Sequence, residues 1–117
     1  MFRPALACIL AATAFPAVAQ DADYIDDRSS PAALMRSLYN AINRHEYARA
    51  WSYFAKPPAA DLEAYAAGYA DTQTVELITG IAREEGTAGS IYYQLPVAIR
   101  AQAGDGSARV FSGCYTM

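Results

Sequence analysis

Two side chains of this sequence are the first to consider for acid–base chemistry. His45 is the only histidine, and histidine is the side chain that ordinarily titrates near neutral pH. It stands in a polar junction between two predicted helices, beside Arg44 and Glu46, where an exposed or capping role is more usual than catalysis. Asp71 follows the third predicted helix, and a turn or cap residue before Thr72 is its simpler interpretation. His45 and Asp71 are therefore weak catalytic candidates.

The sequence offers no stronger reactive constellation. A single histidine allows no Ser/His/Asp or Cys/His arrangement with a supporting motif. The histidine and Cys114 lack the spacing of a zinc site. Gly86 and Gly89 do not precede a helix, so they do not form a phosphate-binding loop. We therefore expect no metal ion, no cofactor and, on balance, no enzymatic activity.

Tyrosine is the unusual residue of this chain, which has 9 of them. Most are expected to lie in the core with their hydroxyl groups at its edge. The alternative is a pocket with aromatic walls and phenolic hydrogen-bonding groups, which suits a small amphipathic or apolar ligand. The candidates for such a pocket are Tyr39, Trp51, Tyr65, Tyr69 and Tyr93.

The first half of the chain has the pattern of amphipathic helices. Ser30 and Pro31 are typical of a helix start, and apolar residues then recur up to Ile42 at steps of three and four. The predicted buried face of this helix consists of Leu34, Met35, Leu38, Tyr39 and Ile42.

Two further helices are predicted before the pattern changes. Asn43, with Glu46 three residues later, predicts a capping box at the start of the second helix. Pro57 and the proline after it would end that helix. A third helix is expected over about residues 59–70.

The second half of the chain has the alternating pattern of strands. Strands are predicted over residues 74–79, 90–100 and 108–117, and a charged connection over residues 80–89. Residues 104–106 predict a tight hairpin turn. Pro96 inside the longest strand implies a bulge or an edge position. Helices followed by antiparallel strands predict an α+β fold with the helices on one face of a sheet.

The N-terminus predicts export from the cytoplasm. Arg3 precedes an apolar run from Pro4 to Phe15, and Ala17–Ala19 gives the small-x-small pattern of a signal-peptide cleavage site before Gln20. The run is too short for a membrane anchor. Residues 1–19 are therefore predicted to be removed, which leaves a periplasmic or extracellular protein.

The predicted mature chain has an acidic leader and one domain. It carries 8 basic and 12 acidic side chains, and four of the acids lie in a flexible leader over residues 20–29. The remaining residues 30–117 are close to neutral and make one domain, without the basic face that a nucleic acid would need. Cys114 is the only cysteine after residue 19, so no internal disulfide can form.

Several segments resemble one known family. The run YNAINRHEYARAW over residues 39–51 resembles the first helices of the NTF2-like (SnoaL-like) superfamily. Residues 68–72, 88–97 and 113–116 are similar to segments of small exported bacterial members. The resemblance covers residues 30–117 and implies a cone of helices on a curved antiparallel sheet. Such chains usually continue into a further strand, so a chain that stops at Met117 is expected to be a fragment or a shortened product.

The resemblance implies a scaffold and not one activity. The superfamily includes isomerases, dehydratases, transport factors and binding modules, so fold alone does not select among them. The favoured prediction is a non-enzymatic domain that binds a small amphipathic ligand or a protein partner. The alternative is an isomerase or dehydratase that uses a pocket acid, Asp71, with a tyrosine.

The predicted register of the last hairpin leads to two further expectations. A two-residue turn places Cys114 opposite Val97, on the apolar side, as a buried thiol. The same register places four residues on the opposite face, away from the helices, where they would serve a homodimer interface. These residues are Tyr92, Arg100, Phe111 and Tyr115.

Overall fold

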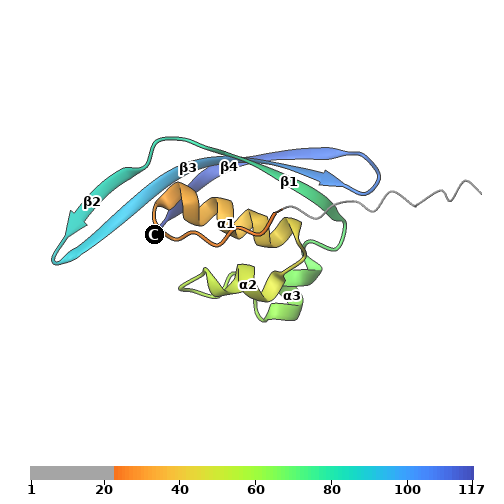
Figure 1. The fold of residues 1–117 in the computed structure, drawn as a ribbon, viewed down its shortest axis with the longest axis horizontal. Helices are drawn as coiled ribbons and strands as arrows, with labels where there is room; N and C mark the ends of the chain where they lie inside the picture. Colours follow the sequence, from red (N-terminus) through yellow and green to blue (C-terminus); the bar gives the residue numbers. More distant parts are fainter. Residues whose placement is uncertain (1–22) are drawn as a thin grey trace, which may run out of the picture.

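A computed structural model describes residues 23–117, except for the side chain of Thr87, as three helices followed by four strands. The helices lie together on one side of an antiparallel sheet (Figure 1). This arrangement is the predicted α+β class. The predicted signal peptide, residues 1–19 with cleavage after Ala19, lies outside the described residues.

Helix α1 (Pro31–Asn43) supplies most of the core. It begins where predicted, because Ser30 Oγ accepts a hydrogen bond from the Ala33 amide at 3.1 Å and Pro31 takes the first helical position. Leu38 and the other residues of the predicted apolar face are buried, apart from Leu34, which is partly buried. The predicted helical face is thereby confirmed.

Asn43 ends α1 and does not cap the next helix, so the predicted capping box is wrong. Its side chain instead bonds to strand β1 (Thr72–Thr79). Asn43 Oδ1 accepts from the Val75 amide at 2.7 Å, and Asn43 Nδ2 donates to the Val75 carbonyl at 2.9 Å. The amide group satisfies both backbone groups of one strand residue, as a neighbouring strand does, and it joins the helices to the sheet.

Helices α2 (Tyr47–Ser52) and α3 (Leu62–Ala67) are shorter than the sequence pattern predicted. Asp61 caps the start of α3: its Oδ1 accepts a hydrogen bond from the Ala64 amide at 2.7 Å. None of the helices in the described part of the chain has the length and apolar character needed to cross a membrane.

The sheet is built around its longest strand, β3 (Ser90–Ala103). Strands β1 and β2 (Arg83–Thr87) pair with β3 one after the other along one side, and β4 (Ala108–Thr116) pairs along the other side. All three pairings are antiparallel. Strand β2 lies in the segment predicted as a connection, and the β2–β3 hairpin projects beyond the helices (Figure 1). The pattern missed β2 because a strand that packs on nothing shows no apolar alternation.

Pro96 lies in the central strand at the point where β1 has ended and β2 has not begun. Proline has no N–H to donate, so a gap between neighbouring strands is a suitable place for it. The Pro96 carbonyl accepts a hydrogen bond from the Gly80 amide at 2.8 Å. A Cβ at Gly80 would lie 3.2 Å from the Pro96 Cβ, so this close approach favours glycine.

The turn between β3 and β4 has three residues, Gly104–Gly106, where two were predicted. The Ala103 amide donates to the Ser107 carbonyl at 2.8 Å, and Gly106 has a φ of 89°. A three-residue hairpin loop of this kind uses a glycine in the left-handed region to rejoin the strand. The additional residue shifts the register of the whole hairpin by one position.

This shift overturns the expectation for Cys114. It pairs with Pro96 rather than with Val97, and successive side chains of a strand point to opposite faces. Cys114 therefore lies on the outer face of the sheet and is exposed. The prediction of a buried thiol is wrong.

The shift also divides the four residues predicted to share one outer face. Phe111 pairs with Ile99, and Tyr115 pairs with Leu95, which is 1% exposed. Both rings therefore belong to the inner face, on the side of the helices. The other two members of the predicted interface lie on the outer face: Tyr92 and Arg100. The predicted grouping is wrong.

The acidic leader was predicted to be flexible, but its described part, residues 23–29, lies against the helices. Its backbone is hydrogen-bonded to Ser37 and Asn40 of α1 and to Arg49 of α2. These contacts are polar, and a search for apolar periodicity does not detect them. We call residues 23–29 the strap.

Candidate functional site

A cleft of about 1410 Å³ opens between α3 and the inner face of the sheet. Tyr65 and Tyr69 line it on the helical side. Ile99, Phe111 and Tyr115 line it on the side of the sheet. We call this concavity the cleft.

Phe111 remains accessible in the cleft because the helices do not cover strand β4. The backbone of β4 approaches β3 and no other helix or strand of the described chain. Phe111 is consequently 51% exposed, although it lies on the inner face opposite Ile99. An apolar side chain that faces the helices but is not packed under them is available to a ligand.

Aromatic rings gather around Tyr65, which α3 holds under the cleft. Its ring meets Trp51 edge-on at a centroid distance of 5.8 Å and Phe54 at 6.0 Å. Tyr69 completes the group at 5.4 Å and stacks on Tyr47 at 6.0 Å. Edge-to-face pairs at such distances are favourable beyond the area they bury, so the helical wall of the cleft is held in place by its own rings.

The hydroxyl groups of this cluster differ in their partners. The oxygens of Tyr39 and Tyr115 lie 2.7 Å apart, so one hydroxyl donates to the other across α1 and β4. The Tyr65 hydroxyl is buried, has the Tyr69 hydroxyl as its neighbour, and makes no well-formed hydrogen bond within the described chain. Burial raises the pKa of Tyr39 and of Tyr65 far above the usual range, so both remain protonated donors at neutral pH.

The structure brings together most of the predicted ligand-binding residues. Tyr65 and Tyr69 line the cleft, and two others support it: Trp51 packs on Tyr65, and Tyr39 holds Tyr115. Tyr93 is not among the residues that line the cleft; its backbone exchanges hydrogen bonds with Met117.

Three aromatic residues of the cleft were not predicted as ligand-binding: Phe54, Phe111 and Tyr115. The sequence placed Phe111 and Tyr115 on the wrong face because the turn before them was taken as one residue too short. The local signal for the correct face was the pair of glycines, Gly104 and Gly106, which is compatible with a three-residue turn that ends in a left-handed glycine.

His45 lies apart from the cleft, in the turn between α1 and α2. It is exposed, its φ is 58°, and its Nδ1 lies 3.0 Å from the Tyr47 hydroxyl. Its amide bonds to the Ile42 carbonyl at 3.0 Å, so the residue closes the end of α1. The structure thus gives His45 a place in a helix-ending turn.

Asp71 lies on the rim of the cleft and is exposed. Its carbonyl accepts a hydrogen bond from the Gly104 amide at 3.1 Å, which ties the start of β1 to the β3–β4 turn. Asp105 and Arg109 also line this rim. The Ser107 hydroxyl and amide hold the Asp105 carboxylate and lower its pKa, so the rim carries fixed charges of both signs.

Within residues 23–117, no three or more His, Cys, Asp or Glu side chains group in a way that would hold a metal ion. The site is therefore described by its rings, its hydroxyl groups and the charges on its rim.

These features define a class: an α+β domain with an aromatic cleft between its helices and the inner face of its sheet. Compared with known proteins, the chain matches no family model, no curated protein and no solved structure. The NTF2-like resemblance therefore stays a prediction, and a function has to be inferred from the residues of the cleft.

Proposed function

We propose that this protein is an exported, non-enzymatic domain of the NTF2-like kind that binds a small amphipathic ligand in the cleft. Phe111 is the observation that carries the proposal. Its ring faces the concave side of the sheet and is 51% exposed. Accessible aromatic surface inside a concavity, with a few polar groups around it, is what small-molecule sites typically offer.

The cleft suggests the chemistry of its ligand. Ile99 and Phe111 offer an apolar surface to a flat or elongated body. Tyr115 offers a hydroxyl beside that surface, whereas the Tyr65 hydroxyl is buried beneath it. A molecule with an apolar ring or chain and one carbonyl or hydroxyl group would satisfy both kinds of surface.

Export is proposed from the N-terminal pattern alone. Arg3, the apolar run and the alanines before Gln20 have the form of a cleaved signal peptide. Intact mass of protein recovered from the periplasm or the medium tests this: we expect Gln20 as the first residue. A product that still begins at Met1 would contradict it.

An enzyme of the isomerase or dehydratase type is the second candidate. One observation favours it: Asp71 lines the same cleft as Tyr69 and Tyr115. The two functions separate on Asp71→Asn. If the protein only binds, this substitution leaves ligand affinity within about twofold, because the carboxylate is on the exposed rim. If the protein is an enzyme that uses this acid, product formation is lost while binding persists.

Binding is tested with the fluorescent probe 8-anilinonaphthalene-1-sulfonate, which has an apolar body and one polar group. We expect a saturable rise in its fluorescence with the folded protein. Phe111→Ser should weaken the affinity about tenfold, which corresponds to about 1.4 kcal/mol of lost contact.

The matched control is Tyr92→Ser, which removes an exposed aromatic ring of similar accessibility, 46%, from the outer face of β3. It should leave the affinity unchanged. Circular dichroism of both variants must match the parent, since loosened proteins also bind this probe. Equal weakening by the two substitutions, or no saturable binding by the folded parent, would overturn the proposal.

A further inference from the structure

Two polar residues are buried in the middle of helix α1, on the side away from its apolar face. Ser37 is fully buried and Asn40 is 7% exposed. A buried polar side chain is unfavourable unless its hydrogen bonds are satisfied. The partners that satisfy these two side chains come mainly from the strap.

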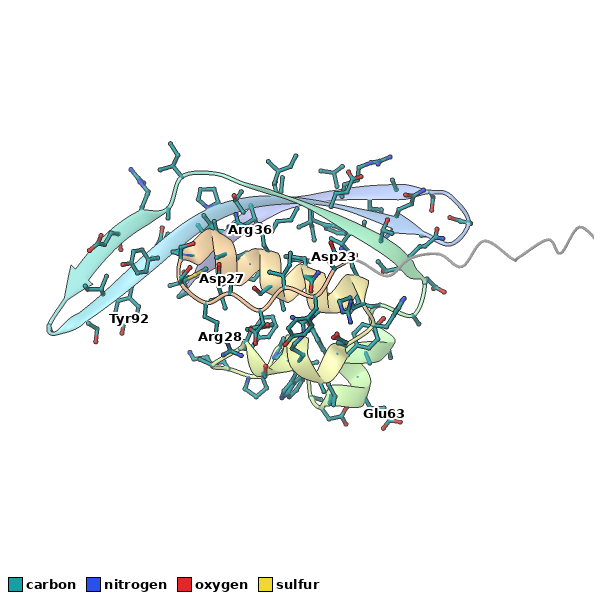
Figure 2. All side chains as sticks on the ribbon, viewed as in Figure 1. Asp23, Asp27, Arg28, Arg36, Glu63 and Tyr92 are labelled. Carbon is teal, nitrogen blue, oxygen red and sulfur yellow. The ribbon has the colours of Figure 1, made fainter. Side chains whose placement is uncertain are left out.

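Ser37 and Asn40 bond to the backbone of three alternate strap residues, Asp23, Ile25 and Asp27. Asn40 Oδ1 accepts from the Ile25 amide at 2.9 Å, and Asn40 Nδ2 donates to the Asp23 carbonyl. Ser37 Oγ accepts from the Asp27 amide at 2.7 Å, and it lies 2.9 Å from the Ala33 carbonyl of α1 and 3.1 Å from the Asp27 carbonyl. The strap partners are backbone groups, which any extended peptide presents. Figure 2 shows Asp23 and Asp27 toward opposite ends of the segment that runs beside α1.

Arg49 of α2 adds a third anchor. Its Nη1 donates to the Ile25 carbonyl at 2.7 Å, and its Nη2 donates to Asn40 Oδ1 at 2.9 Å. The Arg49 guanidinium group thus binds the strap directly, and it also orients Asn40, which binds the strap as well. A guanidinium group has several N–H donors in one plane, so it binds carbonyl oxygens that lie in fixed directions around it.

Three strap side chains make contacts that depend on their chemistry, and one of them is Arg28, whose guanidinium carbon lies 4.5 Å from the centre of the Tyr53 ring. The guanidinium carbon of Arg49 lies 4.5 Å from the centre of the Tyr24 ring, which is a cation–π distance. The Asp26 carboxylate accepts a hydrogen bond from the Tyr53 hydroxyl at 2.7 Å. An aromatic residue, a carboxylate two positions later and an arginine two positions after that are therefore recognised, while residues 23, 25 and 27 are held by their backbone.

The strap buries little of its own apolar surface. All of its described residues are exposed, with Tyr24 at 59% and Ile25 at 40%. A segment held by polar contacts at the surface opens at a lower free energy than the core does. Its only covalent link to the described domain is the chain that continues into Ser30 and α1. The contacts are thus those of a bound peptide that happens to be attached.

We propose that Ser37, Asn40, Arg49 and Tyr53 form a binding groove for an extended peptide, which the strap fills within its own chain. The ligand it takes from another protein is an extended segment in which an aromatic residue, a carboxylate and an arginine follow one another at every second position. Such a segment binds when the strap is displaced. The groove is separate from the cleft and does not depend on what the cleft binds.

A labelled peptide of residues 23–30 is the probe. The protein tested is the full chain with Tyr24→Ala and Ile25→Pro. The first substitution removes the ring that contacts Arg49, and the second removes the N–H that donates a hydrogen bond to Asn40. We expect this variant to bind the peptide saturably. The parent chain should bind it at least about tenfold more weakly, because an attached strap competes at an effective concentration in the millimolar range. A peptide of the same composition in scrambled order is the matched control and should not bind.

Three results would overturn the proposal: no binding by the folded double variant, equal binding of the scrambled peptide, or undiminished binding after Arg49→Gln is added. Amide hydrogen exchange on the unmodified chain covers the case in which the double variant does not fold. The Ile25 and Asp27 amides should exchange at least about tenfold faster than that of Leu38, since the strap opens locally. If all three exchange at one rate, the strap opens only when the whole domain unfolds and is no displaceable ligand.

Discussion

The strap groove lies on α1 and α2, whereas the aromatic cleft lies between α3 and the sheet, and the polar groups of the two regions differ in their partners. In the groove, Ser37 and Asn40 are buried and bonded to the chain's own strap. In the cleft, the Tyr65 hydroxyl is buried without a well-formed hydrogen bond, and Phe111 keeps an accessible face. One region is complete within the described chain, while the other leaves both a polar group and an apolar surface unused.

This difference predicts how each region responds to substitution. Removing a group from the groove leaves other buried groups without partners, which costs more than the bond itself is worth. Removing the Tyr65 hydroxyl breaks no well-formed hydrogen bond. Four measurements make the comparison quantitative. The first tests the packing of the aromatic rings that form the helical wall of the cleft.

Tyr65→Ala should have the largest effect. The ring is 7% exposed and packs edge-on against Trp51, Phe54 and Tyr69, so its removal leaves a cavity and a loosened cleft wall. The free energy of unfolding should fall by about 3–5 kcal/mol, as for other buried aromatic residues replaced by alanine. Urea denaturation followed by circular dichroism measures it. A loss under 1 kcal/mol would mean that the ring is not part of the core.

Asn40→Ala should rank second. The substitution strips partners from the Ile25 amide, the Asp23 carbonyl and Arg49 Nη2. We expect a loss of about 1–3 kcal/mol, together with faster exchange of the strap amides. Gln73→Ala, at an exposed position on the rim of the cleft, is the control and should change stability by less than about 0.5 kcal/mol. Equal losses for the two variants would contradict the role of the groove.

Tyr39→Phe and Tyr65→Phe form a matched pair that differs in one respect. The Tyr39 hydroxyl is bonded to that of Tyr115 at 2.7 Å, whereas the Tyr65 hydroxyl makes no well-formed hydrogen bond within the described chain. Tyr39→Phe should therefore lower the free energy of unfolding by about 1 kcal/mol. Tyr65→Phe should leave it unchanged or raise it by up to about 1 kcal/mol. The reverse order would show that the Tyr65 hydroxyl is satisfied in solution.

The smallest effect should be a loosening of the strap in acid. The Tyr53 hydroxyl and the Arg28 guanidinium hold the pKa of Asp26 below its ordinary value of 3.8. A lowered pKa means that the charged carboxylate favours the docked strap above pH 3.8, and that this contribution is lost as the pH falls through the lowered value. Exchange of the Ile25 amide should therefore accelerate below that pH, after correction for intrinsic rates. Asp26→Asn should remove this dependence, while exchange of the Leu38 amide remains the internal control.

Local pattern was enough to predict the elements that bury an apolar face. Ser30 and Pro31 marked the start of α1, and the residues up to Ile42 gave its buried side. The alternation around Leu95 gave the central strand. Strand β2 was missed because it packs on nothing, and Asn43 was taken for a helix cap because its partner, Val75, lies 32 positions away in the sequence.

The residues of the candidate site also fall into two groups: those that the sequence predicted and those that depended on the register of the sheet. The aromatic character of Tyr39, Trp51, Tyr65, Tyr69 and Tyr93 was the basis for predicting them as one group, since they come from three helices, the turn after α3 and a strand. Tyr93 does not line the cleft. Phe111 and Tyr115 were placed on the wrong face by a single residue in the turn before them. Since side chains alternate along a strand, an error of one residue reverses the direction of each one in β4.

The sequence by itself determined the three helices and three of the four strands, their order, and the apolar face that α1 buries. These properties depend on neighbours within a few positions, where composition and spacing act directly. Only the tertiary structure decided that Cys114 faces outward, that Phe111 opens into the cleft, and that the strap bonds to Ser37 and Asn40. Each of these depends on a register or a polar contact between distant segments, and the geometry that selects it exists only once the helices and the sheet have come together.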